Sequence, residues 1–510
     1  MARPKESMVA EIKEKTKQFL ENREHANNVI DILEYIENEE TSVVIAAIKA
    51  TYKIFTSLLT QNQVLCERVE GKKQTASQKY KLWLFERYID GINSLLTAIK
   101  ATSSNVQELA LCTLMKFVVL ESKHPVKRNS QGETFPVALF NKIIDSLLSR
   151  DIDRRKLLGR FQEYIEYDDV RYYLLDKISV KAAYLKKNLK TEDLNTAVLN
   201  IFTVLEQISR AMPAYSEEGL TNFLTKMPSA ESQISPASKC KNHQRVFENA
   251  WLSFLQLPLP SSVYKKVLML IHGHIIPHMR SPLLLIDFLT ASYDMGGAIS
   301  LLALNGVFIL IHKHNLEYPD FFKKLYSLLN PSIFHVKYKA RFFYLTDLFL
   351  MSTHIPSYLV AAFAKKLSRL ALTAPPTGIL LVIPLVCNLI KRHPNVALLI
   401  NRPDGPTDIT TDPYNVEEPD LSKCGAMDSS LWELKTLQSH YFHQVATSAS
   451  KIDKPFPKEE WEIGELLELK HSELVEQEVK KKMKKVPLEF EVPAGLFGGK
   501  DDTMRSLWTL

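Results

Sequence analysis

Three histidines near the middle of the sequence have a spacing from which a metal site can be built. In the stretch HGHIIPH, His274 and His278 are four residues apart and would share one face of a continuous helix, with His272 close by. Imidazole is a common zinc ligand, but Pro277 interrupts such a helix, and no nearby cysteine or acidic residue completes a tetrahedral shell. We therefore expect these histidines to lie on the surface or in the core, and we predict no metal site.

A glycine-rich stretch near the end of the sequence resembles a phosphate-binding loop only superficially. In AGLFGGKDD, Ala494 stands where that loop needs its first glycine, and Asp501 stands where a Ser or Thr would hold magnesium. The sequence also lacks the motifs G-x-G-x-x-G, G-x-S-x-G and H-E-x-x-H of dinucleotide enzymes, hydrolases and zinc proteases. We therefore expect no catalytic residues, no cofactor and no enzymatic activity.

A run of lysines, EVKKKMKK, is the clearest charged motif. Such a run can contact phosphate or act as a nuclear localisation patch. It can equally be the solvated face of a helix, because three glutamates within residues 473–478 can pair with it along that helix. Both interpretations stay open. The lysines are Lys480, Lys481, Lys482, Lys484 and Lys485.

The composition is that of a folded, reduced, intracellular protein. The hydrophobic share of 45% and the charged share of 24% are ordinary for a globular chain, and 510 residues are too many for one compact core. The net charge of +6 permits a setting rich in nucleic acid without requiring one. The charged N-terminus lacks the apolar segment of a secretory signal. The five cysteines are widely spaced, which disfavours disulfide bonds and a cysteine-based zinc site.

Apolar residues recur at helical spacing through most of the chain, and long alternating strand patterns are missing. Prolines fall at the boundaries between these segments, where their fixed φ suits a first helical turn. Successive helices then begin about 20 residues apart, near residues 319, 332, 356 and 377, and two of them make a unit of roughly 40 residues. The sequence therefore predicts an all-α fold, an elongated HEAT- or armadillo-like α-solenoid of stacked helix pairs with long polar loops and an extended C-terminal tail.

The predicted organisation has four parts. An N-terminal helical-repeat region covers residues 1–224, and a Ser-, Pro- and Lys-rich linker or long loop covers 225–243. A C-terminal helical-repeat region covers 244–450. Residues 451–510 form a charged tail, which we expect to be largely extended or to wrap a neighbour.

Two stretches are apolar enough to raise the question of a membrane, residues 295–311 and 377–390. A span needs about 20 apolar helical residues. Pro375 and Pro376 shorten the second stretch, which would rise only roughly 21 Å as a helix. A helix buried in a stacked array is also apolar all round. We therefore favour a buried core, and a protein of the nuclear envelope is the alternative.

Three stretches of the C-terminal half are specific together. The first, residues 316–372, contains a helix led by Tyr-Pro. The second, residues 412–445, contains an acidic loop that begins Asp-Pro and leads into SSLWEL. The third is KIDKPFPKEEW, residues 451–461. Together they resemble the CCAAT-binding-factor family of nucleolar complex associated proteins, with the family domain at about 300–448 and a weaker match over the first 230 residues.

The resemblance implies a helical-repeat scaffold without enzymatic activity, located in the nucleus and nucleolus. It implies a heterodimer with nucleolar protein 14 within the small-subunit processome, which matures the 18S rRNA and assembles the 40S subunit. It implies contact with pre-rRNA, directly or through other proteins. The family's name raises DNA-binding transcription as a further alternative, but the sequence has no helix-turn-helix, zinc-finger or basic-zipper signature.

No motif locates the partner interface, so only general candidates can be named. Trp432 and Trp461, together with the lysines of the run, are the candidate contacts to partner or RNA, because tryptophan is enriched at binding hot spots. For Trp432 a place in the core is the favoured alternative. Ser429 or Ser430 is expected to cap the helix that follows, with Glu433 completing a capping box. Leu431, Leu434 and Leu437 are expected to form its buried face.

Overall fold

The computed structural model describes residues 5–64, 75–126, 135–188, 195–212, 220–225, 235–403 and 411–481. The described residues are mainly helical and contain no strand, which confirms the predicted all-α repeat fold. The chain divides into two compact units, Met1–Pro319 and Asp320–Leu510. The division at 225–243 stays a prediction.

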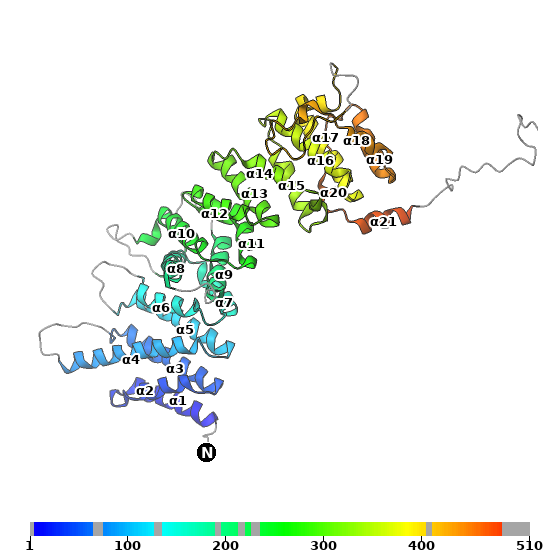
Figure 1. The fold of residues 1–510 in the computed structure, drawn as a ribbon. Helices are drawn as coiled ribbons and strands as arrows, with labels where there is room; N and C mark the ends of the chain where they lie inside the picture. Colours follow the sequence, from blue (N-terminus) through cyan, green and yellow to red (C-terminus); the bar gives the residue numbers. More distant parts are fainter. Residues whose placement is uncertain are drawn as a thin grey trace, which may run out of the picture. The chain divides into compact units, whose positions relative to one another are not determined.

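The first unit consists of two layers of helices. In the odd layer, α1, α3, α5, α7, α9, α11 and α13 pack on one another in that order. In the even layer, α2, α4, α6, α8 and α10 do the same, and α12 packs on α13. Figure 1 shows these helices stacked in sequence order. The odd layer is α1 (Lys5–Glu21), α3 (Thr41–Thr60), α5 (Ser104–Lys123), α7 (Arg155–Ile165), α9 (Asn195–Ala211), α11 (Ser261–Leu270) and α13 (Gly297–His314). The even-numbered helices are α2 (Asn28–Glu34), α4 (Ala76–Ala98), α6 (Val137–Leu147), α8 (Asp168–Asn188), α10 (Cys240–Leu255) and α12 (Ile286–Tyr293).

The core of the first unit lies between the two layers. Phe55 of α3, Tyr88 of α4 and Phe117 of α5 are all buried, and their ring centroids lie 5.3 to 6.4 Å apart in edge-on arrangements. Such contacts add to the free energy of burial. Local signals also fix the helix ends: Thr75 and Gln78 form both hydrogen bonds of a capping box at the start of α4.

The ends of the predicted linker are tied to the first unit. The Asp169 carboxylate, at the start of α8, accepts hydrogen bonds from the Leu224 amide (3.0 Å) and from the amide (2.9 Å) and hydroxyl (2.7 Å) of Thr225. At the other end, the buried ring of His243 is hydrogen-bonded to the carbonyl of Ala237 at 2.7 Å. The residues between 225 and 235 lie outside the described part of the chain.

The second unit is built around α17. This helix packs against α16, α19, α20 and α21, and every side chain from Thr377 to Ile390 is buried. Predicted helix starts near 319, 356 and 377 are confirmed, but the one near 332 is a short 3-10 helix, η8 (Pro331–His335), and α15 begins only after it. The remaining helices are α14 (Phe321–Ser327), α15 (Lys339–Phe349), α16 (Ser357–Ala371), α17 (Pro376–Arg392), α18 (Trp432–Thr436), α19 (His443–Ala449), α20 (Gly464–Glu468) and α21 (His471–Lys480).

Two described helices are long and apolar enough to cross a membrane by length and composition alone, α3 and α13. In α3 56% of the apolar window is buried within the protein, and in α13 50%. Core helices of a repeat array pass the same criterion, so the finding is weak evidence for a span. The stretch 377–390 is buried on all sides within the second unit, as expected.

Candidate partner-binding surface

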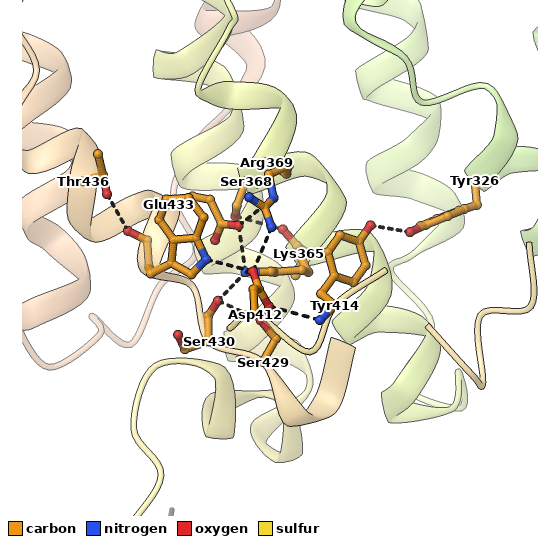
Figure 2. A network of polar contacts seen from close by, with 12 residues as sticks. Tyr326, Lys365, Ser368, Arg369, Asp412, Tyr414, Ser429, Ser430, Glu433 and Thr436 are labelled. Atoms are coloured by element: carbon orange, nitrogen blue, oxygen red, sulfur yellow. Dashed lines mark hydrogen bonds and ion pairs between the residues drawn. The ribbon is translucent and has the colours of Figure 1, made fainter. Parts of the chain in front are cut away.

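Lys365 is a cation buried inside the second unit. Its side chain has no exposed surface, and its ammonium lies 2.7 Å from Glu433 Oε1 and 2.9 Å from Asp412 Oδ2. It also donates a hydrogen bond to the carbonyl of Ser430 at 2.7 Å. An ammonium removed from water costs several kcal/mol unless it is paired and hydrogen-bonded. Lys365 therefore ties α16 to the acidic loop and to α18, as Figure 2 shows.

Arg369 lies one helical turn after Lys365 and contacts the same two carboxylates. Its Nη2 is 2.8 Å from Asp412 Oδ2 and its Nε is 3.2 Å from Glu433 Oε1. Residues four apart share one face of a helix, which explains why both cations reach the same site. Two cations face two carboxylates, so the charges of this network balance.

The Asp412 carboxylate accepts hydrogen bonds from several groups of the acidic loop and of α18. It accepts hydrogen bonds from Ser429 Oγ (2.6 Å), from the indole N–H of Trp432 (2.8 Å) and from the amide of Tyr414 (3.1 Å). Burial alone would raise the pKa of the Asp412 carboxyl. The hydrogen bonds from Ser429, Trp432 and Lys365 outweigh it and hold that pKa well below its ordinary value. Asp412 is thus ionised at any physiological pH.

Glu433 is shifted in the opposite direction. Burial raises the pKa of its carboxyl above the ordinary value, although Lys365 and Arg369 pull it down. The side chain is wholly buried, whereas Asp412 keeps some contact with solvent. The buried Glu433 carboxyl and the partly exposed Asp412 carboxyl therefore respond differently to acid.

The Trp432 side chain is held in a fixed orientation by this network and is partly exposed to solvent. Its ring centroid lies 4.9 Å from the Arg369 guanidinium and 5.4 Å from the Lys365 ammonium, and 39% of the residue is exposed. Cations over an indole face are attracted by its quadrupole. The favoured prediction of a core tryptophan is therefore wrong, because the N–H bond to Asp412 and the two cations keep the ring at the surface.

The predicted capping box at the start of α18 is also wrong. The residue at the cap position is Leu431, and no side chain caps the helix. Ser429 donates to Asp412 instead, and Glu433 is engaged by Lys365. The ion pairs of the network thus outcompete a local cap. The predicted apolar face is confirmed, because the three leucines expected there are buried: Leu431, Leu434 and Leu437.

A second contact holds the start of the acidic loop. The hydroxyl groups of Tyr326 in α14 and Tyr414 lie 2.5 Å apart, as Figure 2 shows. Burial raises the pKa of Tyr414 to about 12. Lys366 covers the Tyr326 ring at 3.8 Å and donates to the Tyr326 carbonyl at 3.0 Å. Burial lowers the pKa of Lys366 to about 8. Sequence reasoning missed both lysines of α16, whose signal is a Lys-Lys pair that directly follows the apolar run Leu359–Ala364.

Large apolar side chains are also exposed on elements that pack close to α18. α16, α18 and the 3-10 helix η9 (Pro394–Leu399) pack near one another, and the Leu431 amide donates to the Leu399 carbonyl at 2.9 Å. We call the exposed side chains of these neighbouring elements the Trp432 surface. Its members are Tyr358 (41% exposed), Leu398 (41%), Ile400 (36%) and Trp432 (39%).

Trp461, the other predicted tryptophan contact, is hydrogen-bonded through its backbone to α17 of its own unit. The buried side chain of Asn388 in α17 bonds both backbone groups of Trp461, donating to its carbonyl at 2.8 Å and accepting from its amide at 2.9 Å. Lys391 donates to the carbonyl of Lys458, and Arg392 bridges Asp347 and Glu460. We call residues 456–463 the strap. These residues lie against α17 of their own unit. Any contact of Trp461 with a partner stays a prediction.

The lysine run lies only partly within the described residues. Lys480 pairs with Glu476, and Lys481 pairs with Glu478, at the end of α21. These contacts favour a solvated, salt-bridged helix face for the two lysines. Lys482, Lys484 and Lys485 lie outside the described residues, so contact of the run with phosphate stays a prediction. The glycine-rich stretch at 494–502 also lies outside them.

The histidine stretch forms an irregular helix end. His272 and His274 lie in a short π-helix, Ile271–Ile275, and His278 follows in a 3-10 turn. Burial lowers the pKa of His278, with a further contribution from His274. In the described residues, no group of three or more His, Cys, Asp or Glu side chains is placed to hold a metal ion.

The architecture and the network define a helical-repeat protein whose second unit carries a fixed aromatic surface. Two family models match it. The CBF/Mak21 family covers residues 300–449, which include the whole Lys365 network, and the model described as "Nucleolar complex protein 4-like, TPR repeats" covers residues 2–188. The resemblance seen in the sequence motifs is thereby confirmed.

Full-length relatives are similar along nearly the whole chain. Nucleolar complex protein 4 homolog B of Xenopus laevis is 48% identical over 95% of this chain and 93% of its own length. The homologue of Homo sapiens is 44% identical over 96% of each chain, and that of Danio rerio is 43% identical over 98% of this chain and 96% of its own. The chain belongs to the nucleolar complex protein 4 family.

Proposed function

We propose that this chain is a non-enzymatic nucleolar scaffold for biogenesis of the small ribosomal subunit. It acts as a heterodimer with nucleolar protein 14 within the small-subunit processome, where it supports processing of the 18S pre-rRNA and assembly of the 40S subunit. Its relatives are named as nucleolar complex proteins, which supports a nucleolar location and a role within an assembly. The step to this assembly and partner rests on the family resemblance of the sequence motifs.

The observation that carries the scaffold role is the presentation of Trp432. Its ring is oriented by a hydrogen bond to Asp412 and by two cations, so little side-chain entropy is lost when a partner covers it. Tryptophan is enriched among the residues that form binding hot spots. The network around it is charge-balanced, which suits a structural support.

The first test is purification of the tagged full chain from nuclear extract at about 0.5 M salt, where the Debye length is only a few Å. Half of each sample is treated with RNase. We expect nucleolar protein 14 to be retained in near-equal amount in both halves. Loss of all nucleolar proteins, with membrane proteins retained instead, would contradict the scaffold and favour the nuclear envelope.

A second arm asks which surface holds the partner. Ile400→Glu places a charge on the Trp432 surface without touching the Lys365 network, and Tyr344→Ala removes an exposed aromatic ring from α15 as a control. We expect the first variant to lose the partner and the second to keep it. Equal retention by both variants would place the partner elsewhere.

A further inference from the structure

Three lysines of the first unit form a cationic surface on two adjacent helices. Lys49 and Lys53 lie on α3 and Lys116 lies on α5, and all three side chains are exposed. α3 and α5 pack against one another in the odd layer. None of the ion pairs or hydrogen bonds between described residues involves these three lysines. Their charges are therefore not neutralised by a carboxylate within the described residues.

Tyr52 lies between Lys49 and Lys53 in the sequence of α3 and contacts Lys116 of α5. The Lys116 ammonium lies 5.1 Å from the centroid of the Tyr52 ring, which itself packs on Phe117 at 6.0 Å. Lys49 and Lys53 are four residues apart and flank Tyr52 along the solvent face of α3. Lys116 thus lies over a partly buried aromatic ring, and the other two lysines are near neighbours of Tyr52 along α3. We call Lys49, Tyr52, Lys53 and Lys116 the lysine surface.

Some exposed cations of the odd layer are paired with a carboxylate on their own helix, whereas those of the lysine surface are not. Arg160 of α7 pairs with Glu163 at 2.7 Å, and Arg210 of α9 pairs with Glu206 at 2.7 Å. α3, by contrast, contains no acidic residue in its 20 residues. An uncompensated group of cations produces a positive potential that attracts polyanions.

The surroundings favour a strand of phosphates over a membrane. No large apolar side chain of α3 or α5 is exposed, so these helices offer nothing to insert among lipid tails. Lysine ammonium groups bind phosphate as point charges without reading base edges. The ring of Tyr52 is packed between Phe117 and Lys116, which leaves the surface without a free stacking platform.

We propose that the lysine surface binds the phosphate backbone of single-stranded RNA, with little sequence preference. The inference rests on the proposed function only for the identity of the RNA, which would then be pre-rRNA. It places a direct RNA contact in the first unit, far along the chain from the Trp432 surface.

The test measures binding of the full chain to a fluorescein-labelled, mixed-sequence 30-nucleotide RNA by anisotropy between 50 and 200 mM KCl. The variant is K49Q/K53Q/K116Q, which keeps long side chains of good helix propensity. The control K142Q/K187Q/K241Q removes the same charge from exposed lysines of α6, α8 and α10 in the even layer. All chains keep the C-terminal lysine run.

We expect the first variant to bind at least tenfold more weakly at 50 mM KCl. Its slope of log affinity against log salt should fall by about two units, as for three lost phosphate contacts on a single strand. The control should stay within about twofold. Equal losses in both variants, or no loss in the first, would overturn the proposal. So would lysine-dependent binding to phosphatidylserine vesicles without binding to RNA. None of these outcomes bears on capture of the protein partner, which the purification tests separately.

Discussion

The Lys365 ammonium and the Glu433 carboxylate lie 2.7 Å apart, and neither side chain has any exposed surface. The pair joins the middle of α16 to the first turn of α18, and Asp412 and Arg369 close the network around it. Breaking such a pair leaves a buried charge uncompensated, which is far more costly than replacing both charges. The network therefore fixes where Trp432 stands.

Lys365→Met is expected to lower the free energy of unfolding by about 3–5 kcal/mol, because it strands the Glu433 carboxylate in the core. The double variant Lys365→Met, Glu433→Leu should regain most of that loss, since Arg369 and Asp412 then remain as a balanced pair. Urea unfolding followed by tryptophan fluorescence measures both. Lys323→Met, at an exposed position of α14, is the control. A double variant as unstable as the single one would refute this account of the network.

The contribution of Asp412 is expected to depend on pH. Its folded-state pKa lies below the ordinary 3.8, so its stabilisation is present above that value and is lost as the pH falls through the lower, folded-state pKa. Asp412→Asn should therefore destabilise the protein strongly at pH 7 and progressively less below about pH 4. Unfolding free energies of both proteins at pH 7 and pH 3 decide this. A difference that does not change with pH would show that ionisation of Asp412 contributes nothing.

Lys366 is expected to lose its proton near pH 8, because burial lowers its pKa to about 8 from 10.5. The unfolded chain then holds the extra proton between these two values, so the free energy of unfolding should rise with pH across that window. The rate of acetylation of Lys366, read by mass spectrometry, should reach half of its maximum near pH 8. Lys323, which is exposed on α14, serves as the reference. Identical pH profiles for both lysines would contradict the assigned environment.

Asn388→Ala is expected to release the strap. The variant loses two hydrogen bonds to the Trp461 backbone, each contributing about 1 kcal/mol. Trypsin should then cut after Lys458 about tenfold faster or more, because local opening exposes that bond. Asn395→Ala, at an exposed position of η9, is the matched control and should cut at the wild-type rate. An unchanged rate in Asn388→Ala would mean that the other contacts alone hold the strap.

Local patterns were enough to predict the helices but not the network. Period, prolines and apolar runs predicted the repeat fold, the boundaries at Pro356 and Pro375, and the burial of residues 377–390. These features depend on neighbours within one or two turns. The ion pair of Lys365 with Glu433 depends on two segments meeting in space, and no local spacing encodes it.

The two errors at α18 have the same origin. Ser430 and Glu433 have the spacing of a capping box, and Trp432 precedes an apolar face, so local reasoning places the glutamate at the helix start and the indole in the core. In the structure the buried Lys365 of α16 forms an ion pair with Glu433, and the indole N–H of Trp432 donates a hydrogen bond to the Asp412 carboxylate. Tertiary electrostatics therefore decided both residues against their local preference.

The most direct test of the scaffold account is the affinity between the purified full chain and purified nucleolar protein 14, measured by titration calorimetry at about 0.3 M salt. Trp432→Ala should raise the Kd at least tenfold, about 1.4 kcal/mol or more, as for a binding hot spot. Ile400→Glu should do likewise, whereas Tyr344→Ala should leave the Kd unchanged. Wild-type affinity in both of the first two variants, with their folds intact, would contradict the claim that the Trp432 surface holds the partner.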